Sequence, residues 1–328
     1  MNDYVPKRGL RNGHVMTVYC WGKPRAFPAL PPPMERCFEI ERATRVLAHC
    51  HWQHNPAAHP ALIALHGLEG SSAAHYMRGI AAKAYGRGFN VVLLNQRNCG
   101  GTEALSDGLY HSGLTADAAH VITELHREGV DRIVVAGYSL GGNLALKLAG
   151  EYGGAPPAAL KGVCAVSPVI ELAECVRALE RRANVVYQWN FVRGLKARMR
   201  RKSAAHPGRF PLARLPMVRT VRQFDEYFTA PHFGFADADD YYFRASAMRV
   251  VDRIRIPALV ITAEDDPFVP VEIFRNPQLR GNPNITVVVT KHGGHCGFAA
   301  NANGVDDGYW AERQIVEFAE KVATRRSP

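Results

Sequence analysis

From residue 61 onward, short and uninterrupted apolar runs alternate with longer stretches in which apolar and polar residues are mixed. A strand in a parallel sheet is buried on both faces and therefore reads as a continuous apolar run. The runs that fit this description are residues 62–65, 91–94, 133–136, 163–166, 259–262 and 285–289. They predict an α/β fold with a mostly parallel central sheet.

The stretches between these runs show helical spacing. Apolar residues at positions i, i+3, i+4 and i+7 form one stripe along a helix, which suits a helix that covers one face of a sheet. The spacing occurs at Met77, Ile80, Ala81 and Ala84, at Ala118, Val121, Ile122 and Leu125, and at Ile315, Phe318, Ala319 and Val322. Leu140, Leu144 and Leu148 mark another helix directly after the run 133–136. We therefore expect helices to flank the sheet.

The first forty residues lack this alternation and are rich in proline. They predict an irregular arm that leads into an edge strand at 37–41, which pairs with a second strand at 45–50. His49, His51 and His54 surround the second strand, but no other ligand cluster at a usual zinc spacing accompanies them. We therefore predict a solvent-exposed hairpin and no metal site.

The alternation of strands and helices stops between residues 172 and 252, over roughly eighty residues where a crossover needs only about a dozen. The first part of this stretch is helix-like and basic, and the second part is aromatic. We predict a helical cap over the carboxyl ends of the strands, where open α/β sheets bind ligands. The predicted division is a core at 1–171 that includes the arm, a cap insertion at 172–252, and the rest of the core at 253–328.

Charge is concentrated in the cap. The chain has a formal net charge of +10 at pH 7, and residues 181–224 contain twelve Lys or Arg and no Asp or Glu. No nucleic-acid-binding motif accompanies this basic segment, so we expect no nucleic-acid partner. Peripheral contact with an anionic membrane through the basic cap is an alternative that the sequence leaves open.

Composition and local patterns favour a cytoplasmic protein. The chain has 328 residues, of which 47% are hydrophobic and 21% charged, as in ordinary globular proteins. No apolar leader stands at the start, and no run reaches the length of a membrane span. The seven cysteines are scattered and include no C-x-x-C pair, which favours reduced thiols.

The sequence Gly-Tyr-Ser-Leu-Gly at 137–141 stands between an apolar run and a predicted helix. In this context G-x-S-x-G is typical of a nucleophile elbow, a tight turn that exposes a serine hydroxyl above the sheet. Glycine is needed on both sides because larger side chains would collide with the neighbouring strand and helix. A serine hydroxyl also needs a base to remove its proton. Ser139 is therefore the candidate nucleophile, and an acid and a histidine should follow it in that order.

Both partners follow at the ends of predicted strands. Asp266 lies on the loop after 259–262, and His295 lies in a glycine-rich loop after 285–289. Spacing alone does not choose between Asp266 and its neighbour Asp265, and His292 competes with His295. Glu171 stands at another position from which this fold can supply the acid. Asp266 and His295 are the residues that we predict.

Two backbone amides are candidates for an oxyanion hole, in which each donor is worth about 3 kcal/mol. One belongs to Leu140, directly after the candidate nucleophile, and the other to Leu68 in the loop after strand 62–65. His66 leaves that buried strand, so we expect it to organise the loop rather than act as a base. Arg97, in the loop after 91–94, is expected to brace the site.

Five motifs together resemble the YheT-like branch of the α/β-hydrolases, which is the fourth AB-hydrolase family. They are H-G-L-E-G-S-S, N-Q-R-N-C-G-G-T, G-Y-S-L-G-G-N, A-E-D-D-P-F-V-P and H-G-G-H-C-G-F. Segments 222–246 and 10–17 add to a resemblance that covers nearly the whole chain. It implies Ser139 as nucleophile, Asp266 as acid and His295 as base. Val15-Met16 departs from the Leu-Gln that relatives commonly carry, which leaves the role of the arm open.

The resemblance implies hydrolysis of carboxylic esters through an acyl-enzyme, with short to medium acyl chains or lipid-like esters as small-molecule substrates. Acyl transfer to an alcohol and thioester hydrolysis would use the same residues, so they stand as alternatives. A protein that binds membrane or nucleic acid through the basic cap is the alternative from another class, and metal-dependent hydrolysis is a third. We expect no cofactor and no metal.

Overall fold

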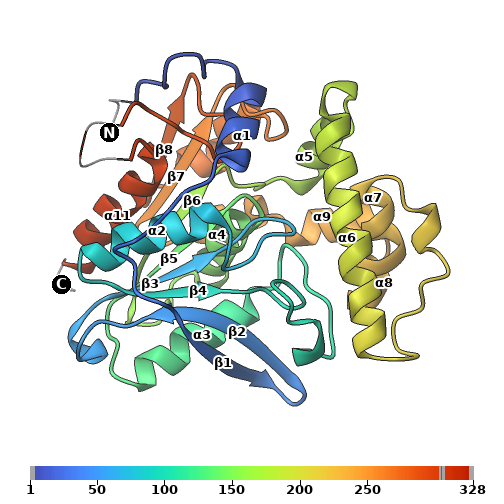
Figure 1. Cartoon of the computed structure of the whole chain (residues 1–328), viewed down its shortest axis with the longest axis horizontal. Coiled ribbons are helices and arrows are strands. Elements are labelled where there is room, and N and C mark those ends of the chain that lie inside the picture. Colours follow the sequence, from blue (N-terminus) through green and yellow to red (C-terminus); the bar gives the residue numbers. More distant parts are fainter. Residues whose placement is uncertain (1–3, 303, 305–306, 325–328) are drawn as a thin grey trace.

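One sheet runs through the computed structural model of the chain, which describes residues 4–302, 304 and 307–324 (Figure 1). Its strands are β1 Met34–Glu41, β2 Thr44–His51, β3 Ala61–Leu65, β4 Asn90–Leu94, β5 Ile133–Tyr138, β6 Leu160–Val166, β7 Ala258–Ala263 and β8 Ile285–Thr290. They are arranged in the order β1-β2-β4-β3-β5-β6-β7-β8. Strands β3 to β8 pair in parallel, whereas β2 is antiparallel to both of its neighbours. The predicted mostly parallel sheet is confirmed.

The six apolar runs all lie in β3 to β8. Every residue of β3, β4, β5 and β7 is buried, because these strands have neighbours on both sides and helices on both faces. Strand β8 is at the edge of the sheet and is only partly buried. Continuous apolar runs therefore identified the parallel strands correctly.

Two helical layers cover the sheet. Helices α2 His75–Gly86 and α11 Trp310–Ala323 pack on one face, against a core that includes Leu62 and Ala64 of β3. Helices α3 Ala116–Arg127 and α4 Leu140–Tyr152 pack on the other face. All four were predicted from their spacing. In the part of the chain that the structure describes, no helix combines the length and the apolar character that crossing a bilayer requires.

The arm predicted to be irregular contains helix α1, Gly13–Gly22. The Asn12 side chain caps it by accepting a hydrogen bond of 3.2 Å from the Val15 amide. No proline stands between Pro6 and Pro24, so the proline-rich composition of the arm does not affect this stretch. The prediction of an irregular arm was therefore wrong for these ten residues.

The hairpin of β1 and β2 is also less exposed than predicted. Strand β1 is the outer edge of the sheet, as expected, but β2 pairs with β4 along His49 and His51. The His51 side chain is buried as a result. The prediction of an exposed hairpin was wrong because β2 has a neighbouring strand on each side. The sequence of β2 alone does not reveal the second neighbour.

The segment between β6 and β7 is largely helical. Its helices are α5 Leu172–Leu179, α6 Val185–Ala205, α7 Val221–Phe224, α8 Ala230–Phe233 and α9 Ala238–Ala245, with a π-helical turn at Asp225–Thr229. A further short helix, α10 Pro277–Arg280, precedes β8. Figure 1 shows α6 to α9 beside the sheet, on the right of the view.

Helix α6 uses part of its positive charge to hold the core. Arg198 Nη2 lies 3.0 Å from Glu69 Oε1 in the loop after β3, and Arg201 Nε lies 2.6 Å from Glu103 Oε1 in the loop after β4. The ammonium of Lys202, which is fully buried, donates to the Glu103 carbonyl at 3.0 Å. The carboxyl-terminal half of this basic helix therefore faces the strand ends, where the cap was predicted to lie.

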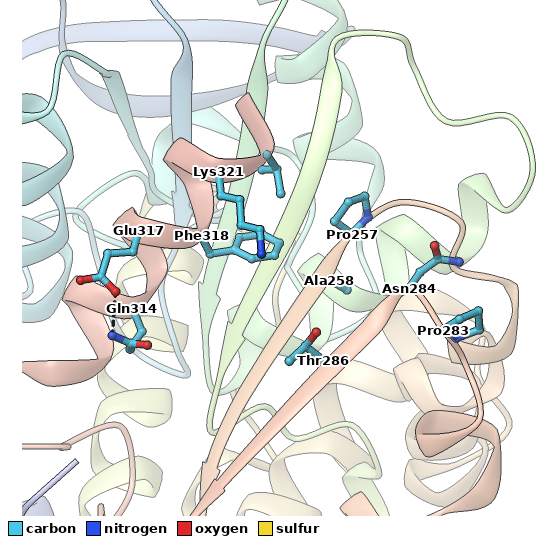
Figure 2. A pocket seen from close by; sticks show the side chains of 10 residues that line it. Pro257, Ala258, Pro283, Asn284, Thr286, Gln314, Glu317, Phe318 and Lys321 are labelled. Atoms are coloured by element: carbon cyan, nitrogen blue, oxygen red, sulfur yellow. Dashed lines mark hydrogen bonds between the residues drawn. The ribbon is translucent and has the colours of Figure 1, made fainter. Parts of the chain in front are cut away.

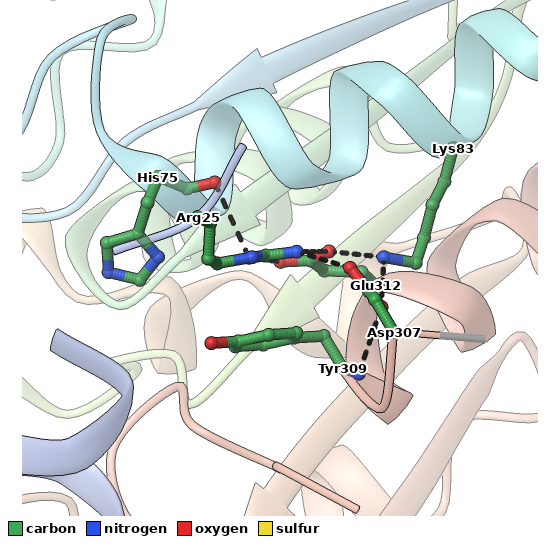
Figure 3. Close-up of polar contacts among 6 residues, drawn as sticks. All are labelled: Arg25, His75, Lys83, Asp307, Tyr309 and Glu312. Carbon is green, nitrogen blue, oxygen red and sulfur yellow. Dashed lines mark hydrogen bonds and ion pairs between the residues drawn. The ribbon is translucent and has the colours of Figure 1, made fainter. Parts of the chain in front are cut away.

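The arm is fastened to the rest of the fold by a cluster of charges (Figure 3). The Arg25 guanidinium is 2.5 Å from Glu312 of α11 and 2.8 Å from Asp307, and it stacks 3.5 Å from the centre of the Tyr309 ring. Lys83 of α2 contacts both carboxylates, at 2.8 and 2.7 Å. Arg25 and Glu312 are buried, so their pairing is well shielded from water.

Replacing Glu312 should therefore destabilise the protein strongly. In Glu312→Ala the buried guanidinium of Arg25 loses its closest carboxylate, and we expect a loss of about 3 kcal/mol or more in the free energy of unfolding. Urea denaturation followed by circular dichroism measures it.

Glu320→Ala is the matched control, because Glu320 lies on the same helix and pairs at 2.9 Å with the exposed Arg87. It should cost no more than about 1 kcal/mol. Equal losses in the two variants would contradict the proposed anchoring of the arm.

Candidate active site

Ser139 lies at the turn between β5 and α4, in the strand-turn-helix context that the sequence predicted. Its backbone has φ 55° and ψ −113°, a left-handed conformation that costs a residue other than glycine about 1 to 3 kcal/mol. The Ser139 amide donates to the Val166 carbonyl of β6 at 2.8 Å. The strained turn is thus held by the neighbouring strand.

The glycines on either side of Ser139 leave no room for side chains. A Cβ at Gly137 would lie 2.0 Å from the Gly141 carbonyl oxygen, and one at Gly141 would lie 2.3 Å from the Leu65 carbonyl oxygen. Gly67, in the loop after β3, would bring a Cβ to 3.3 Å from that of Ser139. The predicted steric reason for the small residues is confirmed.

His295 and Asp266 form a buried pair. The His295 Nδ1 atom is 2.9 Å from Asp266 Oδ2, and the Asp266 side chain is completely shielded from solvent. Burial disfavours the charged imidazolium, but the Asp266 carboxylate outweighs this effect and raises the pKa of His295. The other carboxylate oxygen accepts hydrogen bonds from the amides of Phe268 and Val269. Asp266 is thus fixed by the backbone and in turn fixes the imidazole.

The neighbouring aspartate has a different partner. Asp265 Oδ2 is 3.4 Å from Nδ1 of His292, and Asp265 Oδ1 accepts a hydrogen bond of 2.9 Å from the Gly294 amide. The geometry therefore places Asp266 against His295 and leaves Asp265 to support the loop that carries the histidine. Glu171, the other candidate acid, pairs with Arg249.

His66 uses both of its ring nitrogens to join two loops. Nδ1 is 2.8 Å from the Gly67 carbonyl, and Nε2 accepts a hydrogen bond of 3.1 Å from the Gln96 amide. Burial lowers the pKa of His66 to about 4, so the ring is neutral at physiological pH. These contacts agree with the predicted loop-organising role. Arg97 likewise braces the fold, because its guanidinium pairs with Asp117 at 2.6 Å.

The two candidate oxyanion donors lie on the elements that were expected to carry them. Leu140 is the first residue of α4, so its amide belongs to the first turn, where N–H groups lack an acceptor within the helix. Leu68 follows Gly67, whose amide donates to the Tyr76 hydroxyl at 3.1 Å. That hydrogen bond fixes the loop next to the elbow.

Sequence reasoning left the arm without a role, and the structure gives it one. Thr17 Oγ1 in α1 accepts a hydrogen bond of 2.8 Å from the His295 amide and donates to the Gly13 carbonyl at 2.7 Å. A Cβ at Gly13 would lie 1.7 Å from the Asp265 carbonyl oxygen, and one at Gly294 would lie 2.5 Å from the Gly13 carbonyl oxygen. Helix α1 thus packs directly on both loops. The only sequence signal was the family resemblance of segment 10–17.

Ser167 was also missed. Its hydroxyl accepts a hydrogen bond of 3.1 Å from the amide of Cys296, the residue after His295. Since Ser139 donates to Val166, the elbow and the histidine loop are bonded to consecutive residues at the end of β6. The loops that carry the candidate nucleophile and the candidate base are thus both anchored at the carboxyl end of β6. No sequence pattern distinguishes this serine from others at strand ends.

An aromatic wall stands beside the imidazole. The Phe268 ring centre is 4.1 Å from that of His295, and Tyr187 of α6 lies 5.3 Å from Phe268. Phe191, one turn further along α6, contacts Phe268 at 6.1 Å. On its far side Tyr187 stacks on His14 of the arm. Both α6 and the arm therefore contribute to the surroundings of His295.

A separate cleft of about 440 Å³ lies at the other end of the strands (Figure 2). Figure 2 shows Pro257 and Ala258 at the start of β7 on one side, and Glu317, Phe318 and Lys321 of α11 on the other. Open α/β sheets bind ligands at the carboxyl ends of their strands. We therefore assign the candidate site to the elbow and not to this cleft.

Comparison with known proteins gives one family and several relatives. A family model described as alpha/beta hydrolase fold matches residues 60–302. The chain is 36% identical over 302 residues to YheT of Escherichia coli (strain K12), which is named as a candidate esterase; the match covers 90% of this chain and 87% of that protein. It is 28% identical over 299 residues to phospholipase ABHD3 of Mus musculus, covering 86% and 72% of the two chains. Monoacylglycerol lipase of Saccharomyces cerevisiae (strain ATCC 204508 / S288c) is 27% identical over 256 residues, covering 75% and 56%.

Solved structures show the same fold at lower identity. The esterase Pf2001 of Pyrococcus furiosus aligns with a TM-score of 0.59 and 18% identity, covering 91% of this chain and 94% of that one. The 2,6-dihydroxy-pseudo-oxynicotine hydrolase aligns with a TM-score of 0.59 and 17% identity, covering 90% and 69%. At this identity the likeness concerns the fold.

The contact between α1 and the histidine loop predicts a local effect on amide exchange. Thr17→Val removes the acceptor of the His295 amide, and an unsatisfied buried donor costs about 1 to 3 kcal/mol. The His295 amide hydrogen should then exchange with solvent ~10-fold faster or more, as measured by hydrogen exchange.

Thr17→Ser keeps the hydroxyl and should exchange at the wild-type rate. An unchanged rate in Thr17→Val would contradict a positioning role for α1.

Proposed function

The chain belongs to the α/β-hydrolase family, and on that premise we propose that it is a serine hydrolase that cleaves carboxylic esters through a Ser-His-Asp triad. The observation that carries the proposal is the hydrogen bond of 2.9 Å between His295 Nδ1 and Asp266 Oδ2. It leaves Nε2 as the proton acceptor, in a loop anchored at the same strand end as Ser139.

In the proposed reaction the Ser139 hydroxyl attacks the ester carbonyl carbon while His295 Nε2 takes its proton. The Asp266 carboxylate stabilises the resulting imidazolium, and the amides of Leu68 and Leu140 donate to the oxyanion. The C–O bond of the ester then breaks, and the alcohol leaves with the proton from His295. Water, deprotonated by the same imidazole, hydrolyses the acyl-enzyme and restores the serine.

The names of the relatives support esters of lipids as substrates, since they include a phospholipase and a monoacylglycerol lipase. We propose that the cap insertion at 172–252 shapes the substrate pocket, because α6 brings Tyr187 and Phe191 to the Phe268 ring beside His295. Acyl transfer to an alcohol and thioester hydrolysis would use the same residues. Product analysis with an added alcohol separates transfer from hydrolysis.

Contact with an anionic membrane through the basic cap is also a proposal, and the contacts of α6 limit where it can occur. Arg198, Arg201 and Lys202 are bonded to core loops, so their charges are not displayed outward as free cations. The side chains of Arg181 and Arg182, just before α6, make no such contacts among the hydrogen bonds and ion pairs of the described residues. A cytoplasmic location likewise stays a prediction.

The central test of the proposal uses Ser139 itself. A fluorophosphonate probe should label the wild-type protein, and Ser139→Ala should abolish labelling because the nucleophile is gone. The wild type should also hydrolyse nitrophenyl esters of increasing acyl length, with Ser139→Ala at the level of the blank. A folded wild type that neither reacts with the probe nor cleaves any ester would refute the proposed function.

The carboxylate of Asp266 predicts a pH effect. Asp266 raises the pKa of His295, so Asp266→Asn should lower it. Imidazolium cannot accept a proton, so activity is lost as the pH falls through this pKa. The acidic limb of the profile of kcat/KM against pH should therefore move to lower pH in Asp266→Asn, while kcat drops about 10⁴-fold.

Asp265→Asn is the control, because Asp265 contacts His292 and Gly294 instead. Its acidic limb should stay at the wild-type pH. A shift of the same size in both variants would contradict the assignment of Asp266.

A further inference from the structure

Two helices expose an unusual set of large apolar side chains. Helix α1 exposes three residues at spacings of three, and the first two turns of α6 expose two adjacent residues and a third one three positions later. Their side chains are between 49% and 70% exposed. The set, which we call the α1–α6 surface, consists of Val15, Val18, Trp21, Val185, Val186 and Trp189.

The two halves of this surface are joined. The rings of His14 and Tyr187 stack with their centres 5.7 Å apart at an angle of 17° between planes. His14 Nδ1 is 3.3 Å from the Tyr187 hydroxyl. Figure 1 shows α1 and the green, amino-terminal end of α6 at the same end of the molecule, in the upper part of the view. The exposed residues therefore belong to neighbouring elements and not to distant ones.

The two segments that carry these residues contain cations and no acids. Residues 4–34, which include α1, contain five Lys or Arg and no Asp or Glu, and residues 181–224, which include α6, contain twelve and none. Exposed cations stand at the ends of both helices: Arg8, Arg11, Lys23, Arg181 and Arg182. The Arg193 guanidinium lies 5.0 Å from the centre of the Trp189 ring. Apolar side chains and cations thus share both segments, and acids are absent from them.

The combination of exposed apolar side chains and cations indicates what kind of partner the α1–α6 surface binds. A second copy of the chain would bring two cationic surfaces together, and their like charges would oppose the contact. Tryptophan and aliphatic side chains with flanking Lys and Arg are instead typical of segments that lie in the interface of an anionic bilayer. We propose that the α1–α6 surface docks the protein onto an anionic lipid bilayer.

Docking at this surface would place the candidate site next to the lipid. Tyr187 contacts Phe268, and Phe268 contacts the His295 ring at 4.1 Å. Only two aromatic rings therefore separate the α1–α6 surface from the imidazole. Lipid-like esters would be presented on the side of the site formed by α1 and α6. The binding itself does not depend on the proposed hydrolysis, so the two can fail separately.

Vesicle flotation tests the proposal on the full chain. The wild type should float with vesicles of phosphatidylcholine that contain phosphatidylglycerol, and binding should weaken as salt is added. It should bind much more weakly to phosphatidylcholine alone, because the electrostatic attraction is missing. Binding to neither type of vesicle overturns the proposal.

Two double variants separate the apolar and the electrostatic contributions. Trp21→Ser with Trp189→Ser should reduce the affinity for anionic vesicles by at least ~10-fold, because both rings leave the interface. Arg181→Gln with Arg182→Gln should reduce it by about fivefold per charge, and only on anionic vesicles. Phe243→Ser is the matched control, since this equally exposed residue lies on α9 outside the surface.

The outcomes distinguish the occupants. If the tryptophan variant binds like wild type, or if the Phe243 variant loses as much, the α1–α6 surface is not the docking site. Light scattering shows whether the protein is a dimer. If the wild type is a dimer and the tryptophan variant is a monomer, the surface binds a second copy of the chain, and lipid docking is overturned. Cleavage of a soluble nitrophenyl ester should be unchanged in the tryptophan variant. A tryptophan variant that loses lipid binding but still cleaves the ester would support docking independently of the reaction. Absence of cleavage in the wild type and in every variant would contradict the proposed function and leave docking unaffected.

Discussion

The absence of space around the turn at Ser139 is the constraint on which the structure depends. Strand β5 and helix α4 meet so closely that a Cβ at Gly137 or Gly141 would overlap backbone carbonyl groups at 2.0 and 2.3 Å. Ser139 makes this turn in a left-handed conformation and is half-buried at the end of the strand. The hydrogen bond from the Ser139 amide to the Val166 carbonyl then fixes the turn against β6.

The candidate acid and the candidate base are positioned by the loops after β7 and β8. Strands β7 and β8 are neighbours, so the loops that follow them meet, but glycine-rich loops need additional contacts to keep one conformation. Ser167 holds the histidine loop to β6, and Thr17 holds it to α1. Helix α1 is in turn held because Arg25, three residues after it in the arm, forms a buried pair with Glu312. An ion pair between the arm and α11 thus contributes to the order of the candidate site.

The sequence predicted those features that are encoded locally. Continuous apolar runs located β3 to β8, helical spacing located α2, α3, α4 and α11, and the order of motifs brought out Ser139, Asp266 and His295 as candidates. Features that depend on distant neighbours were not predicted. The burial of His51 depends on the pairing of β2 with β4, and the contact of Thr17 depends on a loop 278 positions away. The two adjacent aspartates could be separated only when each was seen with its own histidine.

Helix α6 shows why a count of charges cannot define a surface. Its sequence reads as one basic run, yet the structure divides it into two halves with different partners. In the carboxyl-terminal half, Arg198 and Lys202 are buried against loops after β3 and β4, where removing their partners would leave charges without water. The amino-terminal half keeps Val185, Val186 and Trp189 in solvent, while Tyr187 contacts Phe268. One helix can therefore hold the cap in place through its buried charges and also present an apolar surface beside the site. The exposed apolar residues are the feature that an ordinary solvated helix lacks.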